Sequence, residues 1–349
     1  MSTPDSHTAP AQRTPRRHRR LLPIALILLL IALAASTGRV LLGTPMVAPA
    51  DALAVLRGEL VPGISFIVMD SRLPAVAVGA LAGISFGVSG TVFQTLLRNP
   101  LASPDVLGVT LGASAGTVVA MTVFTVTDSG LFWAALFGGI GTAVLVLLVA
   151  SSRRGRDAGR VDDRFVLVGI GVAAALSALI TFLLTRIDPR SAGDLMRWLI
   201  GSLNASTWDC AVVLAGAVVV LAPVVALLAS RLRILELGDD LATALGLPVP
   251  LTRTALILVA VVLAALPVAV TGPLAFIAFL AGPIARALLG RPSLFLSALT
   301  GAVLVLCADL IGQNAFGSTP MPVGVITGAF GAPFLLWMMT RGGGPGQDK

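Results

Sequence analysis

Most catalytic and metal-binding sites use histidine, cysteine and acidic side chains. In this sequence these residues are not spaced so that they could form such a site together. Both histidines, His7 and His18, fall in a polar N-terminal stretch. The two cysteines, Cys210 and Cys307, lie in separate apolar runs, without the close spacing of a metal site or a disulfide framework. We therefore expect no His-centred catalytic site and no bound metal.

One acid, Asp309, stands inside a long apolar run, which makes it a functional suspect in a membrane-spanning segment. It lies a few residues from the expected outer end of that segment, so we favour an interfacial hydrogen-bonding role. An intramembrane enzyme would need a cluster of such groups, and an ion-coupled secondary transporter would normally place paired ionisable residues near the bilayer midplane. The sequence offers neither arrangement.

The composition predicts a chain that lies mostly in lipid. Of its 349 residues, 56% are hydrophobic and 12% charged, and the mean hydropathy is +0.96. A span needs roughly 20 apolar residues. The apolar runs predict about ten spans, near residues 21–42, 73–97, 105–124, 131–150, 164–185, 209–230, 254–271, 272–290, 294–312 and 322–340. This is the pattern of an all-α polytopic membrane protein.

The distribution of basic residues predicts the topology of these spans. All but six of the 24 lysines and arginines fall on the cytoplasmic side when both termini are placed inside, as the positive-inside rule requires. We expect a basic tail at 1–20, a membrane domain at 21–341 and a second tail at 342–349. A cleaved signal peptide is the alternative for the first run, because residues 32–34 resemble a signal-peptidase site.

Glycines recur every fourth residue in two of the predicted spans and form a smooth face on each helix. Glycine faces let helix backbones approach closely, so we expect packing seams. The alternative is a small-residue wall along a substrate path, which would favour the nearby serines. The glycines are Gly79, Gly83 and Gly87 in one span and Gly108, Gly112 and Gly116 in the next.

Two loops have helical signals of their own. The outer loop at 187–208 has apolar residues at helical spacing among charges, which predicts a short interfacial helix. In the inner loop at 231–250, Asp239 and Asp240 suit a helix start, and Gly246 marks its stop. The helix of roughly 7 residues and 10 Å cannot span a membrane. It either rests on the bilayer or docks a cytoplasmic partner, with an apolar face formed by Leu241, Ala244 and Leu245.

Several separate motifs resemble the FecCD-type family of ABC importer permeases, which carry iron-siderophores, haem and cobalamin. The resemblance covers residues 21–340. It rests on Arg72-Leu73-Pro74, Gly90 to Gln94, Arg98 to Gly108, Trp198 to Leu203, Leu237 to Gly246, Gly272 to Phe276, Ala308-Asp309, Pro322 to Gly324 and Gly331 to Phe334.

The resemblance implies a type II ABC importer permease fold and assigns roles to particular residues. The inner loop would couple to the ATPase through Glu236, Leu237, Gly238, Asp239, Asp240, Leu241, Ala244, Leu245 and Gly246. The cytoplasmic gate would be Asn99, Pro100 and Leu101, or an ordinary tight turn. We place Ser85, Ser89 and Gln94 on the translocation path. Arg72, Arg57, Arg190 and Arg197 are the candidates for docking an extracytoplasmic substrate-binding protein.

Two departures from the family pattern concern the docking contacts. Ala75 replaces an arginine that often follows Arg-Leu-Pro, and Gln313 stands where some members have another arginine. Gln313 and the Gly201-Ser202-Leu203-Asn204 segment are more similar to catecholate-siderophore systems, which commonly pair two different permeases.

A further departure concerns helix geometry. The proline at 283 is shifted by one residue relative to many members, which affects the expected helix kink there.

We predict a permease subunit that moves iron-siderophore complexes across the bacterial cytoplasmic membrane and has no enzyme activity of its own. No Gly-x-x-x-x-Gly-Lys-Ser/Thr loop occurs in the sequence, so ATP and Mg would be bound by a partner ATPase dimer. A second permease chain, identical or related, would complete the path, surrounded by membrane lipid. Haem or cobalamin is an alternative cargo, and nucleic acid is not an expected partner.

Overall fold

The computed structural model describes residues 20–105, 107–124, 126, 129–151, 161–187, 189–317 and 319–341. Residues 1–19 of the predicted tail at 1–20 and the predicted tail at 342–349 lie outside the described residues, as do the side chains of Arg190 and Arg197. Within the described part, all regular secondary structure is helical, as predicted.

Seven of the described helical stretches are long and apolar enough to cross a membrane, and three shorter apolar helices accompany them. These ten match the predicted spans in order. They are α1 (Leu21–Leu41), α4 (Leu73–Leu96), α5 (Val109–Val123), α6 (Ser129–Ser151), α7 (Val161–Leu184), α9 (Trp208–Leu235), α11 (Val249–Thr271), α12 (Ile277–Leu289), α13 (Leu294–Asn314) and α14 (Val323–Arg341). The remaining elements are α2 (Pro49–Leu56), α3 (Ile64–Phe66), the π-helix η2 (Ile67–Arg72), α8 (Pro189–Ile200) and α10 (Asp239–Ala244).

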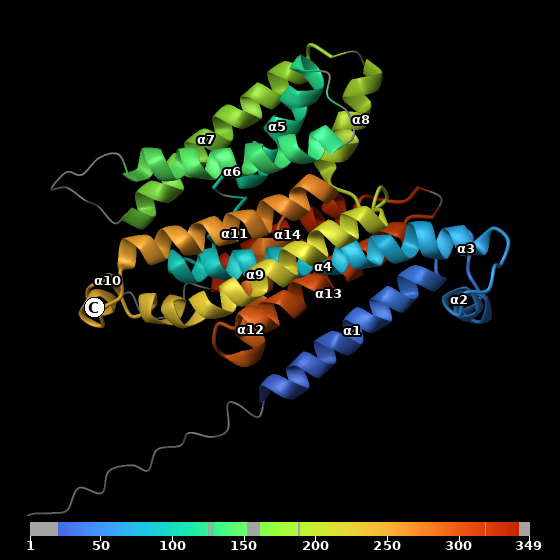
Figure 1. Ribbon diagram of the computed structural model, residues 1–349, viewed down its shortest axis with the longest axis horizontal. Helices are drawn as coiled ribbons and strands as arrows, with labels where there is room; N and C mark the ends of the chain where they lie inside the picture. The colour runs from blue at the N-terminus through green and yellow to red at the C-terminus, as the bar shows by residue number, and fades with distance from the viewer. Residues whose placement is uncertain are drawn as a thin grey trace, which may run out of the picture.

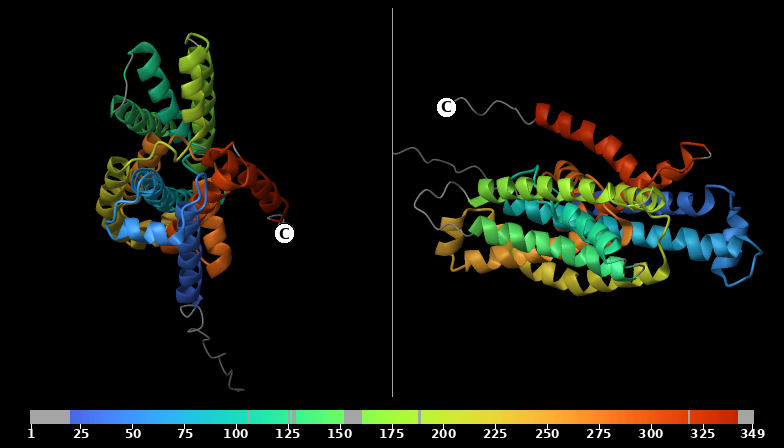
Figure 2. Two further views of the ribbon diagram at one scale, coloured as in Figure 1. Left: turned by 90° about the vertical axis from the view of Figure 1, so that its right-hand side faces the viewer. Right: turned by 90° about the horizontal axis from the view of Figure 1, so that it is seen from above.

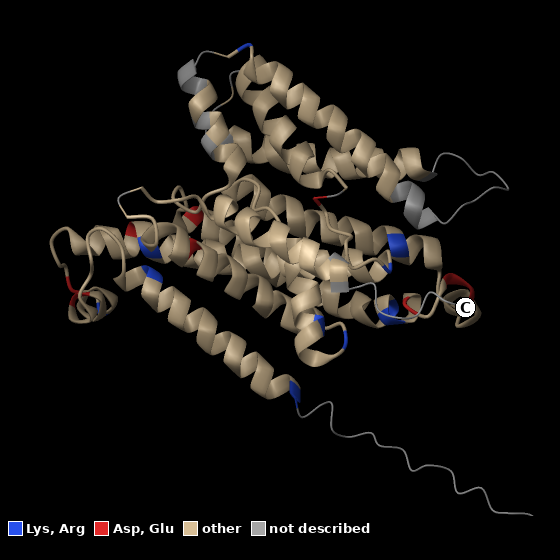
Figure 3. Ribbon diagram, turned by 180° about the vertical axis from the view of Figure 1, so that it is seen from behind, with Lys and Arg blue, Asp and Glu red and all other residues tan. Residues whose placement is uncertain are grey.

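Helix α4 is the central element of the bundle. It packs against α9, α11, α12 and α13, while α5, α6 and α7 form a second group that joins it through α11 (Figures 1 and 2). Helix α10 lies at one end of the bundle and α2 and α3 lie at the other; we name these the α10 end and the α3 end. Most charged residues lie near the two ends, so the long middle of the bundle is apolar (Figure 3).

The second spanning helix begins earlier than predicted. It runs from Ile64 through η2 to Leu96, a continuous stretch of 33 residues, whereas the sequence indicated a start at position 73. The Arg72-Leu73-Pro74 segment suggested a helix start because proline suits the first turn. Here the helix continues through the proline, and the wider π-helical turn lies directly before it.

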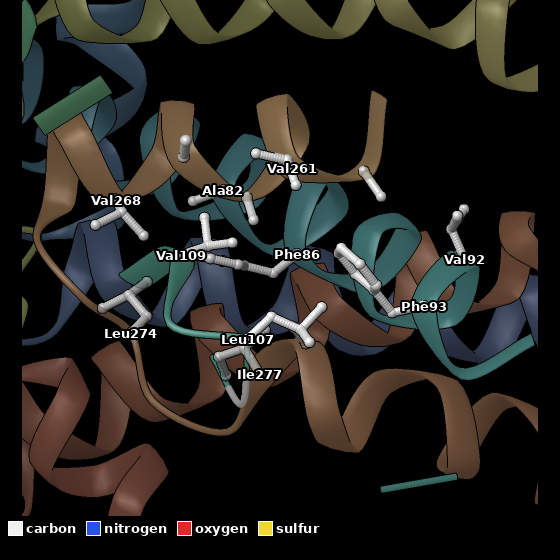
Figure 4. Packing of buried hydrophobic residues seen from close by; sticks show 14 of the residues in the cluster. Ala82, Phe86, Val92, Phe93, Leu107, Val109, Val261, Val268, Leu274 and Ile277 are labelled. Atoms are coloured by element: carbon white, nitrogen blue, oxygen red, sulfur yellow. The ribbon is translucent and has the colours of Figure 1, made fainter. Parts of the chain in front are cut away.

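The main apolar core lies where α4, α5, α11 and α12 meet. Phe86 of α4 is buried there beside Val109 at the start of α5, with Val268 of α11 on one side of this pair and Phe93 of α4 on the other (Figure 4). Lipid is as apolar as these side chains, so their close packing, rather than escape from water, holds the helices together. The core therefore fixes α4 relative to α11 and α12, which carry the candidate sites.

The predicted glycine seams are present in the structure except at Gly108, which precedes α5 with a φ of +77° and whose added Cβ would meet no atom closer than 3.5 Å. A Cβ atom on Gly83 would overlap with the carbonyl oxygen of Gly301 in α13, and one on Gly87 with that of Ser297. In the second seam, Gly112 and Gly116 face the backbone of α6. The small-residue faces thus hold helix pairs in backbone contact, rather than lining an open passage.

Replacement of Gly83 by leucine should separate α4 from α13 and prevent stable folding. Overpacking in a close-packed interior usually costs about 1–3 kcal/mol, and the neighbour here is rigid backbone. The recovered monodisperse protein and its thermal midpoint in detergent would measure the loss. Gly171→Leu is the matched control, because nothing lies within 4 Å of a Cβ at that position. Equal recovery of both variants would contradict the seam.

Candidate functional site

The short helix α10 leaves an apolar face uncovered at its end of the bundle. It spans six residues between Gly238 and Leu245, close to the predicted bounds, and packs against α9 and α11. Ala242 on its inner side is fully buried. On the outer side Leu237, Leu241 and Leu245 are 60%, 48% and 60% exposed, and Ala244 is exposed too. An exposed apolar row of this kind suits contact with the bilayer surface or with a partner protein.

The two acids at the start of α10 have different surroundings. Both carboxylate oxygens of Asp239 accept from Nη2 of Arg253, at 3.0 and 3.1 Å. Asp240 is exposed, and no hydrogen bond or ion pair joins it to another residue in the described ranges. Glu236 and Gly238 precede the helix, and Gly246 follows it with a φ of +79°, which glycine adopts without strain.

Residues of the predicted gate turn line two cavities. One cavity, of about 510 Å³, has the more polar lining of the two and is called the polar cavity here; its lining includes Gln94, Pro100, Glu236 and Arg286. The other cavity, of about 570 Å³, is mostly apolar. Its lining includes Asn99 and Leu101 of the turn, and also Phe276, Phe279 and Leu335. The side-chain oxygen of Asn99 accepts from the backbone N–H of Leu101 at 2.9 Å, which holds the turn in shape. A small backbone movement here would alter both cavities.

The turn also contributes an acid to the apolar cavity. Asp105 lines it and accepts a hydrogen bond from the Thr110 hydroxyl. Asp105 is not among the predicted site residues, because it stands alone at the first position of a predicted span and has no charged partner nearby in the sequence. Among the described residues, no three His, Cys, Asp or Glu side chains come together as a metal site.

The predicted path residues separate into two groups. Gln94 lines the polar cavity, and its amide donates to the carbonyl of Phe279 at 3.0 Å. Ser85 and Ser89 are buried inside the chain; the Ser85 hydroxyl donates to Leu81 of its own helix, and that of Ser89 donates to Ala260 of α11 at 2.6 Å. Ser89 therefore joins α4 to α11, Ser85 bonds only within α4, and neither serine lines either of these cavities.

Arg72 is not an exposed docking residue. It is 4% exposed, and its guanidinium donates to the carbonyls of Val40 at 2.7 Å and Pro45 at 2.6 Å. This corrects the sequence-based expectation: the arginine joins the end of α1 to the start of the long second helix. Arg57, at the end of α2, is exposed at the α3 end. Arg190 and Arg197 belong to α8, the short helix predicted for this loop, but their side chains lie outside the described residues.

Asp309 has a partner that the sequence did not reveal. Nε of Arg39 in α1 donates to its carboxylate at 2.7 Å, and the two side chains are only 8% and 1% exposed. One helical turn further on, the amide of Gln313 donates to the side-chain oxygen of Asn204 at 2.8 Å. The acid thus fastens the peripheral helix α1 to α13 near the α3 end.

Three of the segments that carry the family resemblance meet at one backbone junction. The N–H of Ser202 donates to the carbonyl of Thr271 at 2.8 Å, and the N–H of Gly324 donates to that of Gly201 at 3.1 Å. Gly201 and Gly272 have φ values of +80° and +71°, and a Cβ on either would overlap with the other's neighbouring backbone. Only glycine fits there, so these motifs fix how α8, α11 and α14 join.

The arrangement defines the general class of the protein. Within the described residues, ten apolar helices surround two cavities that residues of one turn help to line, and an uncovered short helix lies at one end of the bundle. A multi-span membrane permease has this organisation, and nothing in the sequence supplies a nucleotide-binding loop. The chain belongs to the FecCD transport family, whose model matches residues 24–341.

Curated relatives match nearly the whole chain. The ferric enterobactin transport system permease protein FepG of Escherichia coli is 39% identical over 93% of this chain and 97% of its own length. The achromobactin transport system permease protein CbrC of Dickeya dadantii is 36% identical over 91% and 90% of the two chains. The Fe(3+)-citrate import system permease protein YfmE of Bacillus subtilis is 32% identical over 94% and 98%.

A solved structure shares the fold. A chain of a metal-chelate type ABC transporter in an inward-facing conformation superposes with a TM-score of 0.78, at 24% identity, over 92% of this chain and 99% of its own length. The predicted type II importer fold agrees with this similarity.

Proposed function

We propose that this chain is the membrane-spanning permease subunit of an ATP-driven ABC importer for iron-siderophore complexes, in the bacterial cytoplasmic membrane. Its near-full-length relatives are named for ferric enterobactin, achromobactin and ferric citrate, which supports an iron chelate as cargo. The observation that carries the proposal is the uncovered leucine row of α10. A helix of six residues held by its inner side alone presents that row to a partner.

The partner at the α10 end would be an ATPase dimer, which binds ATP and Mg²⁺ while this chain binds neither. A second permease chain, identical or related, would complete the translocation path. A substrate-binding protein would dock at the α3 end, where Arg57 is exposed; rim charges of this kind mainly set orientation and encounter rate. The α10 end, and with it both termini, would then be cytoplasmic, and the protein would have lipid but no nucleic acid as a further contact.

Transport would proceed by alternating access. ATP binding closes the ATPase dimer, α10 moves with it, and the turn at Asn99–Leu101 opens or closes between the two cavities. A ligand shifts such an equilibrium only by its different affinity for the two states, so α10 must contact the ATPase differently before and after closure. The iron chelate stays chemically unchanged.

Purification of the tagged chain in mild detergent tests the class of transporter. The proposal predicts that an ABC ATPase co-purifies with the native chain and hydrolyses ATP. A chain that is monodisperse but carries no ATPase, and whose transport depends on an ion gradient, would identify a secondary transporter instead. Competition of uptake by ferric enterobactin, haem and cobalamin would then separate the cargo alternatives.

A further inference from the structure

Arg98 occupies a backbone position that usually belongs to glycine. It follows the last turn of α4, where the N–H of Asn99 donates to the carbonyl of Gln94 and the N–H of Arg98 to that of Thr95, at 3.1 and 3.3 Å. This is the Schellman arrangement, in which the residue after the helix is left-handed and most often Gly. Arg98 has a φ of +47°, so a large side chain is kept here at a cost in backbone strain.

The guanidinium of Arg98 reaches the loop that carries α10. Its Nη2 donates to the carbonyl of Leu235, the last residue of α9, at 2.9 Å. The same nitrogen lies 3.5 Å from the carboxylate of Asp239, the first residue of α10. Arg253 of α11 contacts both oxygens of the same carboxylate, including the one nearest to Arg98, so the three charges form a chain from α4 to α11 across the base of α10.

A positive group at this place also suits the end of α9. The last carbonyls of a helix have no intrahelical partner and carry the negative end of the helix dipole. The Arg98 side chain is 46% exposed, so its ion pair with Asp239 is screened by water and weak by itself. The hydrogen bond to the Leu235 carbonyl fixes the direction of the side chain, and the ion pair adds the first residue of α10 to the same contact.

We infer that Arg98 is a positioning residue that transmits the movement of α10 to the gate turn. It is the residue directly before Asn99, so a displacement of Asp239 or Leu235 is passed to the backbone of the turn without an intervening flexible segment. This inference rests on the proposed function. It also separates the two acids of α10: Asp239 faces the protein's own arginines, and Asp240 is left for the ATPase.

The test is Arg98→Gly, because glycine is the residue that the backbone at 98 prefers. The variant should fold and assemble with its ATPase at least as well as the native chain, and ATP hydrolysis by the purified complex should stay within about twofold. Uptake of radiolabelled ferric enterobactin per ATP hydrolysed should fall by about tenfold, the usual range of coupling between two sites. A purely structural role for Arg98, limited to the hydrogen bond at the end of α9, predicts a changed thermal midpoint and unchanged uptake per ATP.

A double-mutant cycle shows whether the effect passes through Asp239. Asp239→Asn should add little to the loss in Arg98→Gly, while Asp240→Asn, whatever its own effect, should combine with Arg98→Gly independently. Additivity with Asp239→Asn, or uptake per ATP unchanged in Arg98→Gly, would overturn the inference while leaving the importer assignment intact. If no ATPase co-purifies with the native chain, or if the native complex does not take up ferric enterobactin, the proposed function is refuted instead.

Discussion

Asp309→Ala is expected to destabilise the protein by about 3–5 kcal/mol, because it leaves the Arg39 guanidinium buried without a counter-charge. The pair is 2.7 Å apart and almost fully enclosed between α1 and α13. Unfolding in mixed detergent and SDS, followed by the loss of helical circular dichroism, would measure the change. Helix α1 should be the first element to detach, since it packs mainly on α13.

Two variants control for this result. Asp209→Ala removes an exposed acid from the first turn of α9, where a charge near a helix terminus usually contributes no more than about 1 kcal/mol. The double change Arg39→Leu with Asp309→Leu removes both charges and should recover most of the lost stability. If Asp309→Ala unfolds like the native chain, the buried pair does not hold α1 in place.

The second large effect is expected at α10. Leu241→Arg puts a charge in the middle of the exposed leucine row and should weaken binding of the ATPase by about 30-fold or more, as for a central residue of an interface. The chain itself should remain folded, because this side chain is already 48% exposed. Co-purification of the ATPase, and the thermal midpoint of the chain, would measure the two properties separately.

Leu60→Arg is the matched control for α10. Leu60 is also an exposed leucine, at 91%, but it lies in the loop before α3 at the opposite end of the bundle. We expect it to leave the ATPase bound. Retention of the ATPase by Leu241→Arg, or equal loss in both variants, would place the docking surface elsewhere.

The sequence was sufficient for the features that depend on local patterns. Apolar length gave the ten helices in order, and glycine spacing gave the two seams, because a missing side chain has the same effect on whichever helix lies opposite. The helix-start signal at Asp239 and the helix-stop signal at Gly246 predicted the bounds of α10 to within a residue or two. Each of these depends on neighbours within one or two turns.

The features that depend on distant partners could not be predicted. Arg39 and Asp309 are 270 positions apart, and no local sequence pattern around either residue indicates that they form a pair. The family resemblance gave Arg72 a docking role on the outer surface, yet carbonyls at the end of α1 and just after it accept its hydrogen bonds inside the protein. Serines on a glycine-rich helix face can line a hydrated path or donate a hydrogen bond to a neighbouring helix. Ser89 donates a hydrogen bond to α11.

Uptake by the reconstituted importer is the most direct test of the proposed function. The complex purified through this chain would be placed in liposomes with its substrate-binding protein outside the lipid and ATP on the ATPase side. The account predicts accumulation of radiolabelled ferric enterobactin that requires ATP and is lost with Leu241→Arg. Accumulation without ATP, driven by an ion gradient across the same liposomes, would contradict it.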